Sequence, residues 1–141
     1  MKIFVLIFVL FTAPLFASGY EQILDQYFQV GASLTKGSLA DAQKAAEKLA
    51  TSIPANDSAH QKELTALSDQ AKAISTSKDI KDARNAFAGM TEPMKELAGS
   101  TKLEAHEFYC PMVNKSWLQK SDKVQNPYLG KSMPGCGQKK G

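Results

Sequence analysis

The stretch IKDARNAFAGMTEPMKEL, residues 80–97, decides the fold of this chain. Its apolar residues recur at intervals of three and four, which is the period of one face of an α-helix. Pro93 interrupts the run, because proline lacks the backbone donor and its ring clashes with the preceding turn. We therefore expect a helix that kinks at Pro93 or restarts near Thr91. The stripe that this helix buries comprises Ile80, Ala83, Phe87, Met90, Met94 and Leu97.

Three further apolar stripes with the same period precede this run, within residues 20–34, 39–53 and 64–74. Ser38 and Asp41 resemble a capping box at the start of the second stripe, and Pro54 closes it. Each stripe must be buried against another element, and the connections between them are short and polar. The sequence therefore predicts a mainly α protein, with a four-helix, up-down bundle over residues 20–99.

Residues 1–19 have the pattern of a signal peptide. Met1-Lys2 is followed by the apolar run IFVLIFVLFTAPLF, and Ala17-Ser18-Gly19 offers small residues for cleavage. The apolar run is short for a membrane span. We expect a periplasmic or secreted protein with no stable membrane anchor after cleavage, and a single helical domain over residues 20–141.

The charge pattern excludes one class of partner. The chain has 17 Lys and Arg against 14 Asp and Glu, and the lysines alternate with acids from residue 36 to residue 104. Such alternation is typical of solvated helix faces rather than of a basic nucleic-acid-binding surface. We expect no nucleic-acid partner.

The segment 100–141 has a different character, because helical periodicity stops and prolines, glycines and aromatics appear together. It contains the two cysteines of the chain, Cys110 and Cys136, and each has a methionine within three residues, Met112 and Met133. About 40 residues without periodicity are too many for an idle loop in a compact domain. We expect this Cys/Met segment to wrap on the bundle, held by its aromatic residues.

Two interpretations of the cysteines stay open at this point. In an exported protein, two cysteines most often form one disulfide, and closing this loop would stabilise the fold by about 3–4 kcal/mol. Alternatively, thiolate and thioether sulfurs form a soft ligand set that selects Cu(I) or Ag(I) over hard cations. In that case His106, four residues before Cys110, is a candidate to add an imidazole.

The order Y-C-P-M, W-L, N-P-Y-x-G-x-x-M-x-x-C-G over residues 109–137 resembles a bacterial exported family of unknown function. The same domain occurs as the C-terminal extension of periplasmic adaptor subunits of copper/silver efflux pumps. The stretch DARNAFAGM, residues 82–90, resembles the Arg-x-x-Phe element of that family. Pro134-Gly135 departs from it, since relatives tend to carry an apolar and a small polar residue there.

The resemblance implies a soft-metal site and a set of architectural residues. The implied ligands are the sulfurs of Cys110, Met112, Met133 and Cys136. The residues that it implies to be architectural are Trp117, Asn126, Pro127, Tyr128 and Gly130.

No catalytic constellation is recognisable, because a Ser-His-Asp set, a phosphate loop and a nucleophile elbow are all missing from the sequence. We therefore expect a non-enzyme. The favoured function is periplasmic binding of a soft metal, copper first, in metal homeostasis or resistance, with an efflux adaptor as a candidate partner. The alternative is a disulfide-stapled interaction module that docks on an envelope or efflux complex without metal.

Overall fold

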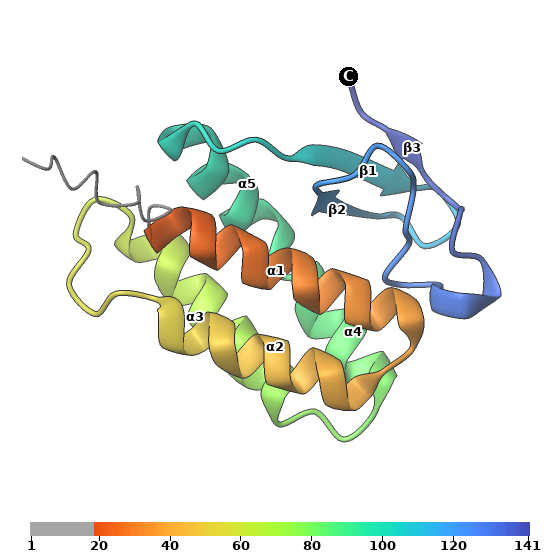
Figure 1. The fold of residues 1–141 in the computed structure, drawn as a ribbon, viewed down its shortest axis with the longest axis horizontal. Coiled ribbons are helices and arrows are strands. Elements are labelled where there is room, and N and C mark those ends of the chain that lie inside the picture. Colours follow the sequence, from red (N-terminus) through yellow and green to blue (C-terminus); the bar gives the residue numbers. More distant parts are fainter. Residues whose placement is uncertain (1–18) are drawn as a thin grey trace, which may run out of the picture.

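The computed structural model of the protein describes residues 19–141. The expected signal peptide falls outside these residues except for Gly19, which opens the first helix. Within the described residues, five helices are followed by a small sheet at one end of the molecule (Figure 1). The helices are α1 (Gly19–Lys36), α2 (Leu39–Ser52), α3 (Gln61–Ser75), α4 (Ile80–Ala88) and α5 (Thr91–Thr101). No helix among them is long and apolar enough to cross a bilayer.

The mainly α prediction is confirmed, but the helix count is five rather than the expected four. The run that decided the fold divides into α4 and α5 at Gly89 and Met90. Pro93 explains the division, because in a continuous helix its ring would clash with the carbonyl of residue 89, four positions earlier. In the observed structure Pro93 lies in the first turn of α5, where its missing N–H costs nothing. The restart at Thr91 is one of the two alternatives that the sequence left open.

The expected stripes form the core between the helices. Ser38 caps α2 by accepting a hydrogen bond from the Asp41 backbone N–H, as the capping box predicts. Phe87 is fully buried and stacks on Tyr27 of α1, with 4.8 Å between the ring centroids. The fully buried side chains include Ile23, Tyr27, Leu34, Leu49, Leu64, Leu67, Ile74, Phe87, Met90 and Met94.

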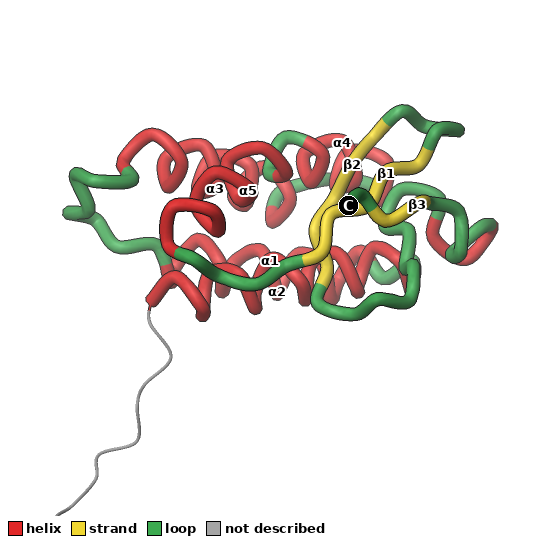
Figure 2. The backbone as a smooth tube through the Cα atoms, turned by 90° about the horizontal axis from the view of Figure 1, so that it is seen from above, coloured by secondary structure: helices red, strands yellow, loops and turns green. Residues whose placement is uncertain are grey.

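We expected the C-terminal segment to be irregular throughout. In the structure it contains three strands. They are β1 (His106–Cys110), β2 (Lys115–Gln119) and β3 (Gln138–Lys139), with one turn of 3₁₀ helix at Gly130–Ser132. The sheet is antiparallel with the order β2-β1-β3, and Cys110 pairs with Lys115 at the turn between the first two strands. Figure 2 shows the strands beside the helices at one end of the bundle. Each strand is too short to give a strong alternating pattern, which explains why the sequence did not predict it.

The bundle covers the outer edge of β2. The Leu118 backbone N–H donates to the Tyr27 hydroxyl at 3.1 Å. The Ser116 carbonyl accepts from the hydroxyls of Thr91 and Tyr128, at 3.0 and 2.7 Å. An edge strand otherwise presents unpaired backbone groups to solvent. Helix side chains thus fix the sheet, and with it Cys110, on the bundle.

We predict that Phe87→Ala lowers the free energy of unfolding by about 3–5 kcal/mol, because it leaves a cavity against Tyr27. The measurement is chemical denaturation followed by circular dichroism. Lys81→Ala, at an exposed position of the same helix, is the matched control and should leave the midpoint nearly unchanged. An unchanged midpoint for Phe87→Ala would contradict the packing described here.

The carboxylate of Glu107 in β1 joins the sheet to α5. It accepts from the ammonium groups of Lys95 and Lys140, at 3.0 and 3.1 Å. Burial raises the pKa of Glu107, but the two lysines lower it by more, so that the net shift is downward. A depressed folded pKa means that this carboxylate stabilises the fold above its unfolded pKa and that the stabilisation is lost as the pH falls.

We therefore predict that Glu107→Gln flattens the decline of the melting temperature between about pH 5 and pH 3. The measurement is a series of thermal melts across that window. Glu47→Gln, at an exposed site on α2, is the control and should keep the wild-type slope. Equal slopes for the two variants would show that Glu107 is not linked to folding.

Candidate functional site

The two cysteines come together although they lie 26 residues apart in the chain. Cys110 ends β1 and shares one face of the sheet with Phe108, because alternate residues of a strand point to the same side. Trp117 is opposite Phe108 in β2 and stacks on it, with 5.7 Å between the ring centroids. The backbone at Gly137 crosses this face, so that Cys136 reaches Cys110.

The backbone of Gly137 packs very closely against the Trp117 ring. Its φ is +155°, and a Cβ there would lie 2.7 Å from the indole ring. Any other residue would therefore have to displace the tryptophan or the backbone. The close approach sets the path of the chain directly after Cys136.

The turn between β1 and β2 surrounds Cys110 with backbone donors. It comprises residues 111–114, and Asn114 adopts a left-handed conformation with a φ of 50°. Asparagine tolerates this conformation better than most residues. The Tyr109 hydroxyl donates to the Asn114 side-chain oxygen at 2.7 Å and braces the turn. The N–H groups of Met112 and Val113 thereby face the Cys110 sulfur.

Asn126 holds the second half of the site and is completely buried. Its Oδ1 accepts from the backbone N–H groups of Tyr128 and Leu129, at 2.8 and 3.0 Å. Its Nδ2 donates to the Cys136 carbonyl at 2.7 Å, and its backbone N–H donates to the Pro134 carbonyl at 2.8 Å. One side chain thus fixes both the Asn126–Leu129 turn and the Cys136 turn.

Arg84 docks this segment on the bundle. Its Nε donates to the Pro127 carbonyl at 2.8 Å, and its Nη2 donates to the Leu34 carbonyl at 3.1 Å. Leu34 lies in the last turn of α1, where a cation is favoured, and its carbonyl also accepts from the Gly37 backbone N–H at 3.1 Å. Gly130, with a φ of +57°, lies directly against the guanidinium, and a Cβ there would clash with it. The acceptors of Arg84 are thus backbone carbonyls rather than a carboxylate.

The two thiols are free and form a hydrogen-bonded pair with 2.8 Å between the sulfurs. Cys110 is fully buried, whereas Cys136 is partly exposed. Burial raises the pKa of the Cys110 thiol. The hydrogen bond from Cys136, the N–H groups of Met112 and Val113 and the Asn126 amide lower it by more, so that its net shift is downward. The same sulfur–sulfur hydrogen bond raises the pKa of Cys136. Cys110 is therefore the sulfur at which the pair stabilises negative charge.

The other proposed ligands differ in their placement. Met112 is 63% exposed and Met133 is 43% exposed, and each belongs to a turn that carries one of the cysteines. His106 is at the opposite end of β1 from Cys110, about 13 Å away along an extended strand. Its Nε2 faces the Asp122 carboxylate at 3.5 Å. The structure thus brings the two cysteines together and leaves His106 outside their reach.

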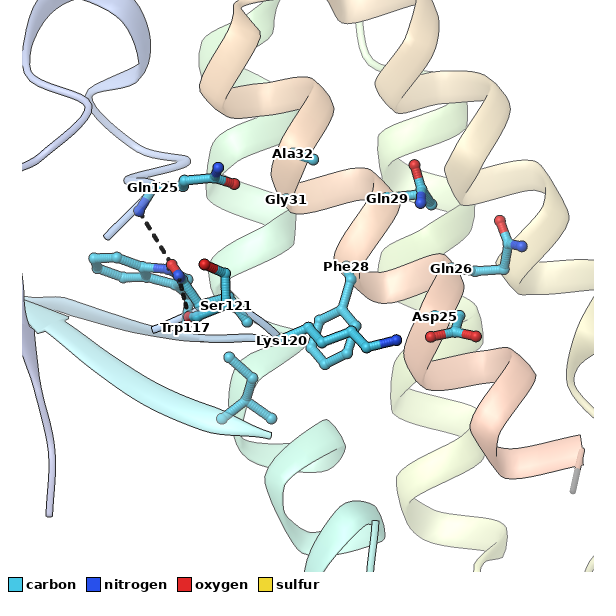
Figure 3. Close-up of a pocket in the computed structure, with 12 residues that line it drawn as sticks. Asp25, Gln26, Phe28, Gln29, Gly31, Ala32, Trp117, Lys120, Ser121 and Gln125 are labelled. Atoms are coloured by element: carbon cyan, nitrogen blue, oxygen red, sulfur yellow. Dashed lines mark hydrogen bonds between the residues drawn. The ribbon is translucent and has the colours of Figure 1, made fainter. Parts of the chain in front are cut away.

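A groove of about 540 Å³ lies between α1 on one side and β2 with the chain that follows it on the other (Figure 3). Its charged lining residues are Asp25 and Lys120, and neither cysteine lines it. Gln119 at its base accepts from the Trp117 ring N–H and the Gln125 backbone N–H, at 2.9 and 3.1 Å. Every buried side-chain polar atom in residues 19–141 has a hydrogen-bond partner.

Sequence reasoning did not reveal the positioning roles of several residues, namely Tyr27, Arg84, Thr91, Gln119 and Gly137. Tyr27 belongs to the apolar stripe within residues 20–34, but its hydroxyl also accepts a hydrogen bond from the Leu118 backbone N–H in β2. Gln119 looks like a surface residue in the sequence and is buried in the structure. A glycine directly after Cys136 was the one signal of a close backbone approach.

The family described as "Protein of unknown function (DUF3347)" matches residues 23–106, and the chain belongs to it. The matched residues include most of α1, all of α2–α5 and the first residue of β1. Both cysteines and their neighbouring methionines lie outside the match. No curated protein and no solved structure matches the chain significantly.

We predict that Arg84→Met releases the segment 126–137 from the bundle while the helices stay folded. The carbonyls of Leu34 and Pro127 lose a charged donor, which costs about 1–3 kcal/mol. Hydrogen exchange at the backbone amides of Gly130 and Cys136 should accelerate, because both amides are hydrogen-bonded within this segment. Lys81→Met on the same helix is the control. Unchanged exchange in Arg84→Met would show that the guanidinium does not hold the segment.

Proposed function

We propose that this member of a family of unknown function is an exported binding protein for a soft monovalent metal ion, copper(I) first and silver(I) second, in metal homeostasis or resistance. The observation that supports this most strongly is the pair of free cysteines, Cys110 and Cys136, with facing sulfurs. The end of β1 supplies Cys110 and the turn that begins at Met133 supplies Cys136, and Met112 follows Cys110 in the next turn. A periplasmic adaptor of a metal efflux system is the candidate partner, and we expect no catalytic activity.

The donor set fits a soft ion better than a hard or borderline one. The sulfurs of Cys110 and Cys136 are thiol donors, and those of Met112 and Met133 are thioethers. Within residues 19–141 no group of three or more His, Cys, Asp or Glu side chains is gathered to hold a metal ion. Zinc sites usually take four nitrogen, sulfur or oxygen ligands of those types, and calcium sites take six to eight oxygens. The arrangement favours an ion that accepts two or three sulfurs.

The environment of Cys110 favours the charged form that binds metal. A thiolate, not a thiol, is the ligand, so that metal binding releases protons. The N–H groups of Met112 and Val113 and the Asn126 amide already face this sulfur and lower its pKa, although burial raises it. These donors would orient the sulfur in the way that outer-shell hydrogen bonds orient metal ligands.

His106 drops out of the proposed ligand set. Its distance along β1 and its contact with Asp122 argue for a surface role. The proposed ligands are therefore Cys110 and Cys136, completed by Met112 or Met133. Leucine matches methionine in volume and lacks only the sulfur, which makes Met→Leu a selective test.

We predict that reduced protein takes Cu(I) from a chromophoric Cu(I) chelator and that Cys110→Ser lowers this affinity by at least about 100-fold. The reason is that even an outer-shell partner is worth about 10- to 100-fold, and a direct ligand is worth more. Met112→Leu should lower it by about 10-fold without changing the melting temperature. His106→Ala is the matched control and should bind like the wild type.

Two outcomes would overturn the copper proposal. One is a reduced wild-type protein that takes no Cu(I) or Ag(I) from the chelator, and the other is binding that survives Cys110→Ser. The alternative function, a disulfide-stapled interaction module, is favoured by the short distance between the sulfurs. It would replace the metal proposal if protein purified from the periplasm contained no free thiol and bound no copper after reduction.

A further inference from the structure

We propose that Cys136 is the entry point for reversible oxidation of this protein by disulfide exchange, with Cys110 as the resolving thiol, and that the resulting disulfide and a bound metal ion exclude each other. The metal half of this proposal rests on the proposed function. The exchange half does not, since it concerns only the apo protein.

The unequal exposure of the two sulfurs sets the order of reaction. Cys136 is partly exposed in a turn, whereas Cys110 is fully buried at the end of β1. Exchange requires a thiolate to approach a disulfide sulfur directly, and we infer that access limits the rate here although the sulfur–sulfur hydrogen bond raises the pKa of Cys136. A dissolved disulfide therefore reaches Cys136 first. Cys110 is already 2.8 Å from the Cys136 sulfur and needs no large movement to complete the second step.

The reaction balances with glutathione disulfide as the oxidant. The Cys136 thiolate attacks one sulfur of glutathione disulfide, which forms a mixed disulfide and releases one glutathione. The Cys110 thiolate then attacks the Cys136 sulfur, which forms the bond between the two protein sulfurs and releases the second glutathione. Two electrons pass from the protein to the oxidant, and the two thiol protons of the protein end on the two glutathiones.

Disulfide formation and metal binding move the sulfurs in opposite directions. A disulfide bond is about 2.0 Å long, so that the sulfurs must approach from 2.8 Å by about 0.8 Å. Two sulfurs that each bind one ion at about 2.3 Å lie roughly 4 Å from each other. To bind an ion, the two sulfurs must therefore move apart by about 1 Å from their observed positions. The observed distance lies between those of the two states, so that oxidation and metal binding require opposite movements of the sulfurs. An oxidised pair also offers no thiolate to a metal ion.

The part that moves is the turn around Cys136 rather than the strand. Cys110 is fixed by its pairing with Lys115 in the sheet, and β2 is in turn held by the bundle. The Cys136 turn is held mainly by Asn126, through the Cys136 and Pro134 carbonyls. Stretching these two hydrogen bonds is the cost of opening the pair for metal, whereas oxidation requires the turn to move toward β1.

The first test uses reduced apo protein and glutathione disulfide, with mass spectrometry at timed quenches. We expect a transient species that carries one glutathionyl group on the peptide with Cys136, followed by an unmodified protein mass less two hydrogens. A transient adduct on the peptide with Cys110, or a stable adduct with no internal disulfide, would overturn the proposed order. This test needs no variant, so that a folding defect cannot obscure it.

Single-cysteine variants give the rates. Cys110→Ser should accumulate the Cys136 mixed disulfide, because the resolving thiol is absent. Cys136→Ser should react at least about tenfold more slowly, since its remaining thiol is buried. Equal rates in the two variants, with both melting near the wild-type temperature, would contradict the access argument.

The second test adds metal and separates this proposal from the proposed function. Protein loaded with one equivalent of Ag(I) should resist glutathione disulfide, and oxidised protein should take no Cu(I) from the chromophoric chelator. If oxidised and reduced protein bind copper equally well, the mutual exclusion is wrong although the protein binds metal. If reduced protein binds no metal, the proposed function and the mutual exclusion both fail, while the order of exchange is decided by the first test alone.

Discussion

The guanidinium of Arg84 is the contact on which the geometry of the candidate site depends. It satisfies a carbonyl in the last turn of α1 and a carbonyl of the C-terminal segment with one rigid group. A lysine at this position could not reproduce the two contacts, because its ammonium is a single point charge on a flexible stem. The position of this guanidinium also requires a glycine at residue 130, since only a residue without Cβ can lie against it. The bundle thus determines where the segment after residue 125 begins its path back to the sheet.

Asn126 transmits that placement to Cys136. Arg84 fixes Pro127, its neighbour Asn126 is buried beside it, and the Asn126 amide holds the Cys136 carbonyl. Every hydrogen-bonding group of this amide has a protein partner, which makes the link specific as well as strong. Two separate sets of contacts therefore hold the two sulfurs next to each other. One is the sheet that carries Cys110, and the other is the chain from Arg84 through Asn126 that carries Cys136.

The sequence predicted the helical part well, because its information is local. The 3-4 spacing around Phe87 specifies a helix face, and Pro93 specifies where that helix is broken. The C-terminal part depends on contacts between distant residues, which leave little trace in a sequence. Arg84 illustrates this, since an arginine on a helix suggests a carboxylate partner and no pattern announces backbone carbonyls 43 and 50 residues away. Both interpretations of the cysteines brought Cys110 and Cys136 together, and the sequence alone did not choose between a disulfide and a metal site.

The arrangement of the four sulfurs gives the proposed site a direction. The thioethers of Met112 and Met133 are in solvent, Cys136 is partly exposed, and Cys110 is buried. Under the proposed function, an ion that arrives from solvent would meet neutral, weak thioether donors before the thiol pair, and the sulfur that best stabilises negative charge is the innermost. If the proposed function holds, such an order would let the outer donors exchange an ion with a partner while the inner pair determines how tightly it is retained. Oxidation acts only on the inner pair, so that it would convert a retaining site into a weak one without removing the outer donors.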